Sequence, residues 1–179
     1  EVGVGGGLIV GGRQLEGAAG YAGEIGHLPF VPDGAPCRCG SFGCWETEIG
    51  THALLARAGL SIDAGQEGVD RLFRAADGGD PVALAAIEAT ARPLGAGLAG
   101  LVNIFNPRLV VLGGLCGRIH AFAGDTIWRE LARRSLPAPR SMVTVVPSML
   151  GADAPLIGAA ELALEPVLSD PAAPIGARD

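Results

Sequence analysis

The sequence predicts a single α/β domain. Strand-like segments come first in the chain, and helical and strand-like patterns alternate further along. The composition agrees with this prediction, since 49% of the 179 residues are hydrophobic, only 4% are aromatic, and glycine occurs 29 times. Such a chain is long enough to enclose a core, and its small residues favour close backbone packing and tight turns.

The first elements follow from glycine positions and apolar patterns. The chain opens with glycines alternating with Val, Leu and Ile and then a glycine pair, so we expect a β-hairpin over residues 2–16. The segment EIGHLPFV, residues 24–31, indicates another short strand. Residues 46–59 predict a helix that ends at Gly59, and residues 68–79 predict a second helix.

Residues 80–107 carry the longest helical pattern in the chain. Asp80 is a good N-cap, and Pro81 suits the first helical turn. Pro93 should kink this helix or split it in two, because proline lacks the backbone N–H. The spacing of three glycines in it indicates a close contact with another helix: Gly95, Gly97 and Gly100.

The C-terminal part alternates strands and helices. Residues 108–114 predict a buried strand that runs into a glycine turn, and residues 118–136 predict a helix. Residues 141–148 predict a strand and residues 153–168 a last helix. We expect the tail at 169–179 to be disordered, because it is short, polar and rich in proline and alanine.

We therefore expect one domain over residues 1–168. Glu1 is followed directly by a strand-like pattern and is not a methionine, so we expect a further segment upstream. The net charge of −6 argues against direct binding of this chain to DNA or to an anionic membrane. No apolar run approaches the length of a membrane span, so we expect no membrane contact.

Three of the four cysteines lie within eight residues, and a histidine precedes them by ten positions. The spacing is H-x9-C-x-C-x4-C, and one imidazole with three thiolates is a common set of ligands for a closed, tetrahedral zinc site. Interleaved Gly40 and Gly43 allow the tight backbone that such a site needs. Four protein ligands leave no open position for water, so the predicted zinc is structural. The predicted ligands are His27, Cys37, Cys39 and Cys44.

Two other interpretations of the cysteines remain open. A disulfide would leave one of the three clustered cysteines over, and cysteines separated by one residue rarely have a geometry that suits a bridge. Three buried free thiols are the other interpretation, although the glycine- and proline-rich loop resembles a surface loop. Cys116 lies far from the cluster and is interpreted as a packing residue.

Two carboxylates flank the predicted zinc site. Glu24 precedes His27 by three residues, and Glu46 follows Cys44 by two. In a strand, residues three apart face opposite sides, but Gly26 permits a kink. Polar groups held by a rigid metal centre could bind the hydroxyls of a small polyol or sugar. The alternative is that both glutamates are solvated or capping residues, as exposed carboxylates usually are.

These motifs resemble one known family. The segments VGVGGGLIVGG, GYAGEIGH, CRCGSFGCWE and NIFNPRLVVLGG resemble the ROK family of sugar kinases and sugar-responsive transcriptional repressors. The resemblance runs from residue 2 to about residue 165. It implies the C-terminal lobe of an actin-like ATPase fold, which is ribonuclease H-like, with a zinc-binding loop and a sugar-site module at about residues 24–46.

The resemblance also implies roles for individual residues. Glu24, His27 and Glu46 would contact the sugar hydroxyls, with His27 using its second ring nitrogen. In kinase members, the glycine hairpin and a later glycine turn face the nucleotide, and their backbone amides can cradle phosphate. The resemblance further implies a homodimer or homotetramer. The glycines at the nucleotide-facing positions are Gly3, Gly5, Gly6, Gly113 and Gly114.

Two departures from the kinase pattern stand out, and the first favours the repressor branch. The kinase hairpin begins with Gly-Thr-Gly, whereas Glu1, Val2 and Gly3 stand here. A carboxylate repels phosphate and valine lacks a hydroxyl donor, so both changes should weaken ATP binding. The catalytic aspartate of the kinases belongs to an N-terminal lobe that these 179 residues do not contain, so we expect no catalytic residue in the chain.

The leading hypothesis is therefore the sugar-sensing effector domain of a cytoplasmic repressor, which contacts DNA only through an upstream helix-turn-helix domain. Sugar binding would shift the population of lobe arrangements and change the spacing of the DNA-binding modules. The alternative is the C-terminal lobe of an ATP-dependent hexose kinase of the glucokinase type, which would also need ATP and magnesium. A purely structural zinc domain is a third possibility.

Overall fold

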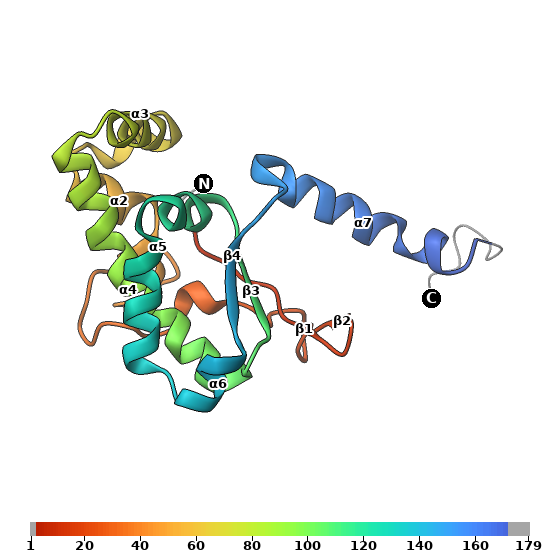
Figure 1. The fold of residues 1–179 in the computed structure, drawn as a ribbon. Helices are drawn as coiled ribbons and strands as arrows, with labels where there is room; N and C mark the ends of the chain where they lie inside the picture. Colours follow the sequence, from red (N-terminus) through yellow and green to blue (C-terminus); the bar gives the residue numbers. More distant parts are fainter. Residues whose placement is uncertain (1–2, 172–179) are drawn as a thin grey trace. The chain divides into compact units, whose positions relative to one another are not determined.

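The computed structural model describes residues 3–171 of the chain (Figure 1). Helices predominate, and the described strands form two small two-stranded sheets. The chain divides into two compact units, residues 1–147 and residues 148–179. The elements of the first unit are β1 (Ile9–Val10), β2 (Arg13–Gln14), η1 (Ile25–His27), α1 (Glu46–Ile49), α2 (Thr51–Arg57), η2 (Ile62–Ala64), α3 (Gly65–Asp77), α4 (Pro81–Phe105), β3 (Leu109–Leu112), α5 (Gly114–Arg134), α6 (Pro137–Met142) and β4 (Thr144–Pro147).

The predicted hairpin at the start of the chain is confirmed, with strands shorter than the range 2–16. Strands β1 and β2 pair antiparallel, with Ile9 opposite Gln14. The turn between them consists of Gly11 and Gly12, whose φ angles are +59° and +81°. Both angles lie in the left-handed region, which tight hairpin turns require and glycine adopts without strain.

The predicted strand at residues 24–31 is wrong. Its first half forms the 3-10 helix η1, and its second half contributes only an isolated bridge between Pro29 and Cys44. Proline lacks the N–H that a strand ladder needs, so pairing does not extend along this segment.

The predicted helix at residues 46–59 is interrupted. Gly50 adopts an extended conformation between α1 and α2, with φ −77° and ψ 176°. Gly59 has φ +69° and follows the last turn, as glycine commonly does at a helix C-terminus. Helix α3 agrees with the prediction for residues 68–79 but begins three residues earlier, at Gly65.

The longest predicted helix is confirmed as α4, and it continues through Pro93 without dividing. Asp80 caps its N-terminus, because its Oδ1 accepts a hydrogen bond from the Ala83 N–H at 2.8 Å. The helix ends at Phe105 and is followed by Asn106, which has a left-handed φ of +45°.

Helix α4 packs closely against α5 and forms the centre of the core. A Cβ atom at Gly95 would lie 2.3 Å from the Ile127 carbonyl oxygen of α5, so only glycine allows this approach. A Cβ at Gly97 would lie 2.1 Å from the indole of Trp45. The predicted close contact with another helix is therefore confirmed at Gly95, whereas Gly97 is close to Trp45 and Gly100 has no neighbour within 4 Å.

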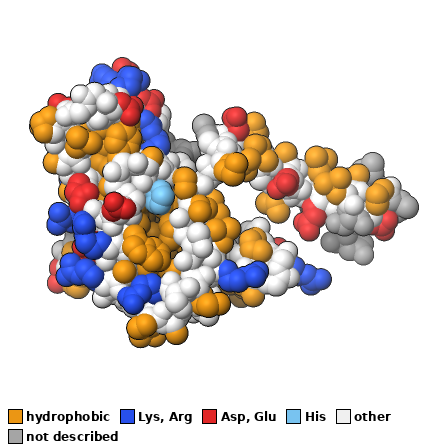
Figure 2. Space-filling view, viewed as in Figure 1, with side chains coloured by type: hydrophobic (Ala, Val, Ile, Leu, Met, Phe, Trp, Pro, Cys, Tyr) orange, Lys and Arg blue, Asp and Glu red, His pale blue; other side chains and the backbone are white. Residues whose placement is uncertain are grey.

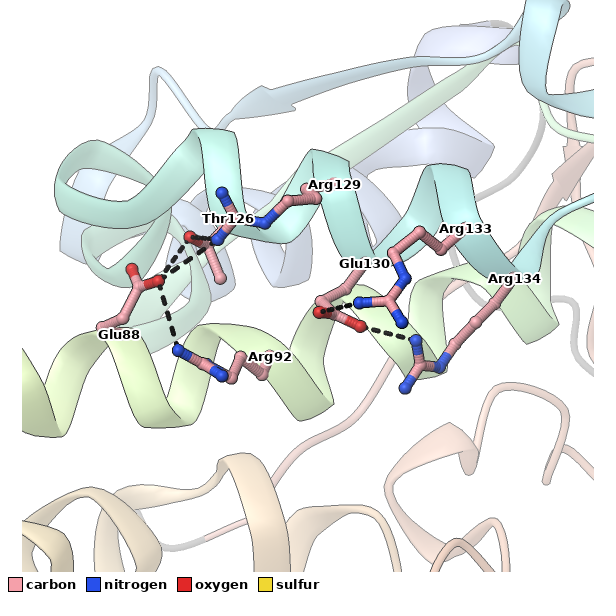
Figure 3. A network of polar contacts seen from close by, with 7 residues as sticks. All are labelled: Glu88, Arg92, Thr126, Arg129, Glu130, Arg133 and Arg134. Atoms are coloured by element: carbon pink, nitrogen blue, oxygen red, sulfur yellow. Dashed lines mark hydrogen bonds and ion pairs between the residues drawn. The ribbon is translucent and has the colours of Figure 1, made fainter.

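Polar contacts flank the buried contact between α4 and α5 (Figure 3). The Thr126 hydroxyl of α5 donates to Glu88 Oε1 of α4 at 2.6 Å, and Arg92 and Arg129 approach the same oxygen. Further along α5, the largely buried Glu130 pairs with two arginines of its own helix, Arg133 and Arg134. These contacts satisfy carboxylates that lie at the edge of the core.

The strands predicted at residues 108–114 and 141–148 are confirmed as β3 and β4. They pair in parallel, with Leu109 opposite Thr144. The predicted burial of the first strand is wrong, because Leu109 and Val111 are 55% and 54% exposed and only Leu112 is buried. Alternate strand residues face opposite sides of the sheet, and α5 covers one side. Figure 2 shows that hydrophobic side chains also reach the surface elsewhere on the viewed face.

By length and composition, helix α4 could cross a membrane. This differs from the expectation that no apolar run approaches the length of a membrane span. However, 56% of the 18-residue apolar stretch within α4 is buried inside the protein. Together with its packing against α5, this burial is what a core helix of a globular domain shows.

The second unit contains η3 (Gly151–Asp153) and α7 (Ala154–Ser169). Helix α7 confirms the last predicted helix at residues 153–168 to within one residue at each end. The predicted tail lies mainly outside the described residues, as do Glu1 and Val2.

Candidate metal centre and its carboxylates

The structure brings the four predicted metal ligands together. The ligand atoms of His27, Cys37, Cys39 and Cys44 all lie within 4.8 Å of one another. The His27 Nδ1 atom is 3.7 Å from the Cys37 Sγ, and the Cys39 and Cys44 sulfurs are 3.6 Å apart. With zinc–sulfur bonds of about 2.3 Å, tetrahedral ligands are separated by roughly 3.8 Å, so this donor set fits a zinc ion.

Backbone hydrogen bonds fold the loop that carries the cysteines. The Cys37 N–H donates to the Ser41 carbonyl at 2.8 Å. Gly40 and Gly43 have φ angles of +92° and +63°, as expected for glycines that turn the chain tightly. A Cβ at Gly43 would lie 1.8 Å from the Val31 carbonyl oxygen, so a larger residue does not fit there.

The thiols differ in exposure and in acidity. Cys37 and Cys44 are buried, and Cys39 is exposed. A backbone hydrogen bond at Cys39 lowers the pKa of Cys37, but the Glu46 carboxylate, burial and the two other thiols raise it to about 12. A backbone hydrogen bond at Ser41 lowers the pKa of Cys39, and burial raises that of Cys44.

The 3-10 helix η1 sets the orientation of His27. Its Nδ1 faces the thiols, and its Nε2 lies 3.7 Å from Glu24 Oε2. A strand would have placed these two residues on opposite sides, but a 3-10 helix has three residues per turn and aligns them. Gly26 lets η1 lie directly against the Val4 backbone, because a Cβ there would lie 2.0 Å from the Val4 carbonyl oxygen.

Glu46 is the first residue of α1 and is held by two contacts. Its Oε1 accepts a hydrogen bond from the Cys37 thiol at 3.0 Å and lies 3.9 Å from His27 Nδ1. Its Oε2 accepts a hydrogen bond from the Val4 N–H at 3.2 Å. The Glu46 side chain is 13% exposed, whereas that of Glu24 is 61% exposed, so only Glu46 is held rigidly by the protein.

Two contributions to this site were not predicted from the sequence. The Val4 N–H donates to Glu46, and the Trp45 N–H donates to the carbonyl of Leu28, which follows His27. The Val4 N–H is a backbone group, so no residue type signals its role. Trp45 lies between Cys44 and Glu46, and its position beside a predicted ligand was the one signal that could have identified it.

The predicted nucleotide-facing glycines fall into two groups. Gly3, Gly5 and Gly6 are exposed, and a Cβ at Gly3 would lie 3.5 Å from Glu46 Oε2, so this group begins beside the carboxylate. Gly113 and Gly114 are also exposed and lie at the N-terminal end of α5, where unpaired backbone N–H groups favour anions.

Two cavities occur elsewhere in the first unit. One of about 280 Å³ is lined mainly by α5 residues that include His120 and Trp128, and another of about 210 Å³ lies at α3 and α4. Neither of these two cavities is lined by Glu24, His27 or Glu46.

Comparison with known proteins gives one consistent family. Residues 1–166 match the profile of the ROK family. The chain is 35% identical over 181 residues to a glucokinase of Streptomyces coelicolor, covering 92% of this chain and 57% of that protein. It is 30% identical over 165 residues to a xylose repressor of Bacillus spizizenii, covering 92% of this chain and 42% of that protein.

A solved structure agrees with these matches. The crystal structure of a ROK family glucokinase from Streptomyces griseus in complex with glucose and AMPPNP superposes with a TM-score of 0.77 and 35% identity. The match covers 89% of this chain and 57% of that one. The chain therefore spans about half the length of the relatives it matches, and these relatives include both a kinase and a repressor.

Proposed function

The chain belongs to the ROK family, and we propose that it is the sugar-binding lobe of a transcriptional regulator of that family, built around a structural zinc ion. One observation carries the proposal: His27 joins the thiol cluster through Nδ1 while its Nε2 lies near the Glu24 carboxylate. The same side chain can therefore bind a metal on one side and a ligand on the other.

In this proposal His27, Cys37, Cys39 and Cys44 hold the zinc. The ion supplies a rigid crosslink, because four protein ligands fill a tetrahedral site. The crosslink fixes the imidazole, whose free nitrogen then becomes a preoriented hydrogen-bonding group.

The sugar contacts in this proposal are Glu24, His27 and Glu46. Both carboxylates accept hydrogen bonds from hydroxyl groups, and charged acceptors give stronger bonds than neutral ones. The Val4 amide restrains Glu46, which reduces the entropy lost when a ligand binds. Three polar groups on one surface suit a ligand with several adjacent hydroxyls.

The assignment to a regulator rests on the first residues of the chain. Glu1 and Val2 replace residues that contact phosphate in the kinase pattern, and both replacements disfavour nucleotide binding. The net charge of −6 favours DNA contact through another domain, and we propose that sugar binding changes the arrangement of such domains in a cytoplasmic homodimer or homotetramer.

A glucokinase-type hexose kinase is the second candidate. It is favoured by the 35% identity to the Streptomyces coelicolor glucokinase and by the TM-score to the glucose complex. In that case, ATP and magnesium would bind near Gly3, Gly5, Gly6, Gly113 and Gly114, whose exposed backbone leaves room for phosphate.

Calorimetry on the natural polypeptide that carries this sequence separates the two candidates. The titrants are glucose, xylose, N-acetylglucosamine and ATP with magnesium, each alone and then ATP in the presence of sugar. We expect sugar binding without ATP binding. ATP binding that a sugar strengthens would favour the kinase, and the absence of any sugar binding would contradict both candidates.

A further inference from the structure

Trp45 connects the candidate sugar site to the core helix α4. Its side chain is 1% exposed, and it lies between the metal-ligand candidate Cys44 and the sugar-contact candidate Glu46. The indole Nε1–H donates to the Pro93 carbonyl of α4 at 2.9 Å. A Cβ at Gly97 would lie 2.1 Å from the indole Cε2.

The contact depends on a notch in α4, formed by the Pro93 carbonyl and the bare Cα of Gly97. These residues are four apart, so they lie on the same face of the helix one turn from each other. In a helix the Pro93 carbonyl would normally face the Gly97 N–H, and a side chain at residue 97 would screen it. Glycine leaves the carbonyl accessible to the indole.

The backbone of Trp45 contacts the segment that carries His27. Its N–H donates to the Leu28 carbonyl at 2.9 Å, and Leu28 directly follows His27. One residue therefore ties the His27 segment, the start of α1 and helix α4 together. The indole contact with Pro93 is partly buried, where a hydrogen bond restrains more strongly than on the surface.

We propose that Trp45 is a positioning residue for sugar binding, and that its indole in the Pro93–Gly97 notch sets the placement of Glu46 relative to His27. This inference rests on the proposed sugar site. The metal ligands would fix Cys44, and the notch adds a separate restraint on Trp45, the residue between Cys44 and Glu46.

The first test is the Trp45→Phe variant of the natural polypeptide. Phenylalanine retains most of the apolar volume but removes the N–H donor to Pro93. We expect sugar affinity to fall by about tenfold, because misplaced contacts lose their strength steeply with distance. Bound zinc should remain at the wild-type amount, since no metal ligand has changed.

Thr126→Val is the matched control. It removes a partly buried hydrogen bond to the same helix α4, on the side that faces α5. We expect it to lower the melting temperature about as much as Trp45→Phe while sugar affinity stays within about twofold. Equal loss of sugar affinity in both variants would show a general stability effect and overturn the proposal.

A second pair of variants tests the notch itself. Gly97→Ala should displace the indole and weaken sugar binding at least as much as Trp45→Phe. Gly100 lies on the same helix, and a Cβ there would have no neighbouring atom within 4 Å. Gly100→Ala should therefore leave sugar affinity unchanged.

The outcomes separate this inference from the proposed function. If the wild-type protein binds none of glucose, xylose and N-acetylglucosamine, the proposed function itself is wrong. If the wild type binds a sugar and Trp45→Phe binds it equally well, the sugar site stands and Trp45 has no positioning role. Loss of zinc from Trp45→Phe would also overturn the proposal, because the indole would then act through the metal.

Discussion

His27 illustrates how much a single side chain can depend on its local backbone. The imidazole has one nitrogen in the thiol cluster and the other near a carboxylate only because η1 turns the chain beside Gly26. The spacing of histidine and cysteines indicates which residues can ligate a metal. The direction in which each nitrogen points is a property of the folded backbone.

At this scale, Cys37→Ser tests the metal centre. A serine hydroxyl remains protonated and is a poor zinc ligand, so we expect the zinc content to fall well below the one ion per chain proposed for the wild type. The measurement is metal analysis after dialysis against zinc-free buffer.

Cys116→Ser is the matched control. Cys116 is half-buried against the core, and burial raises the pKa of its thiol to about 11, so it resembles a packing residue. This variant should retain the wild-type zinc content. Equal zinc loss in both variants would contradict the assignment of the cluster.

Between elements, polar contacts tie helices that are distant along the chain. Asp70 of α3 accepts a hydrogen bond from Arg118 of α5 at 2.6 Å, and the Arg118 guanidinium lies 4.1 Å from the centre of the Phe73 ring. The hydrogen bonds from Arg118 and from Gln66 lower the pKa of Asp70. The partly exposed pair therefore links the stability of the α3–α5 contact to pH.

The pH dependence has a defined sign. A carboxyl with a lowered folded-state pKa stabilises the fold above its unfolded-state pKa of about 3.9, and this contribution is lost as the pH falls through the lower folded-state value. We expect Asp70→Asn to lower the melting temperature near neutral pH, with a difference from wild type that shrinks below about pH 4.

The measurement is thermal unfolding of metal-free protein from about pH 2.5 to about pH 7, so that zinc release does not contribute. In an Arg118→Gln background, Asp70→Asn should have little further effect. A pH-independent difference, or an undiminished effect in that background, would rule out this ion pair as the cause.

For the whole molecule, a buried side chain joins the cysteine loop to the helical core, because Trp45 directly follows Cys44 and contacts α4. The loop carries little regular structure, and its contacts to α4 include the Trp45 notch. The apolar face of β3 and β4 is open, with Leu109 and Val111 more than half exposed.

Removal of the proposed zinc ion should destabilise the first unit as a whole. Ligand binding to the folded state stabilises it by about 2.7 kcal/mol when free zinc is 100-fold above its dissociation constant. For a domain of this size, that corresponds to a melting temperature roughly 5–10 °C higher than after chelation. Differential scanning fluorimetry with and without a chelator measures the shift, and readdition of zinc should reverse it. An unchanged melting temperature would contradict a structural metal.

Features that depend on short stretches of chain were predictable from the sequence. They include the hairpin turn at Gly11 and Gly12, the Asp80 cap, the end of α2 near Gly59, and the grouping of the thiols. In each case the cause is local, because φ preferences, capping hydrogen bonds and ligand types belong to residues a few positions apart.

Tertiary contacts decided the rest. Part of the segment predicted as a strand at 24–31 forms η1, in which Gly26 packs against the Val4 backbone. Strand β3 is largely exposed because α5 covers only one face of its sheet. The notch that receives Trp45 joins residues about fifty positions apart. A sequence reveals which residues can form a metal or sugar site by their chemistry. Their placement depends on packing between distant segments, which only the folded chain determines.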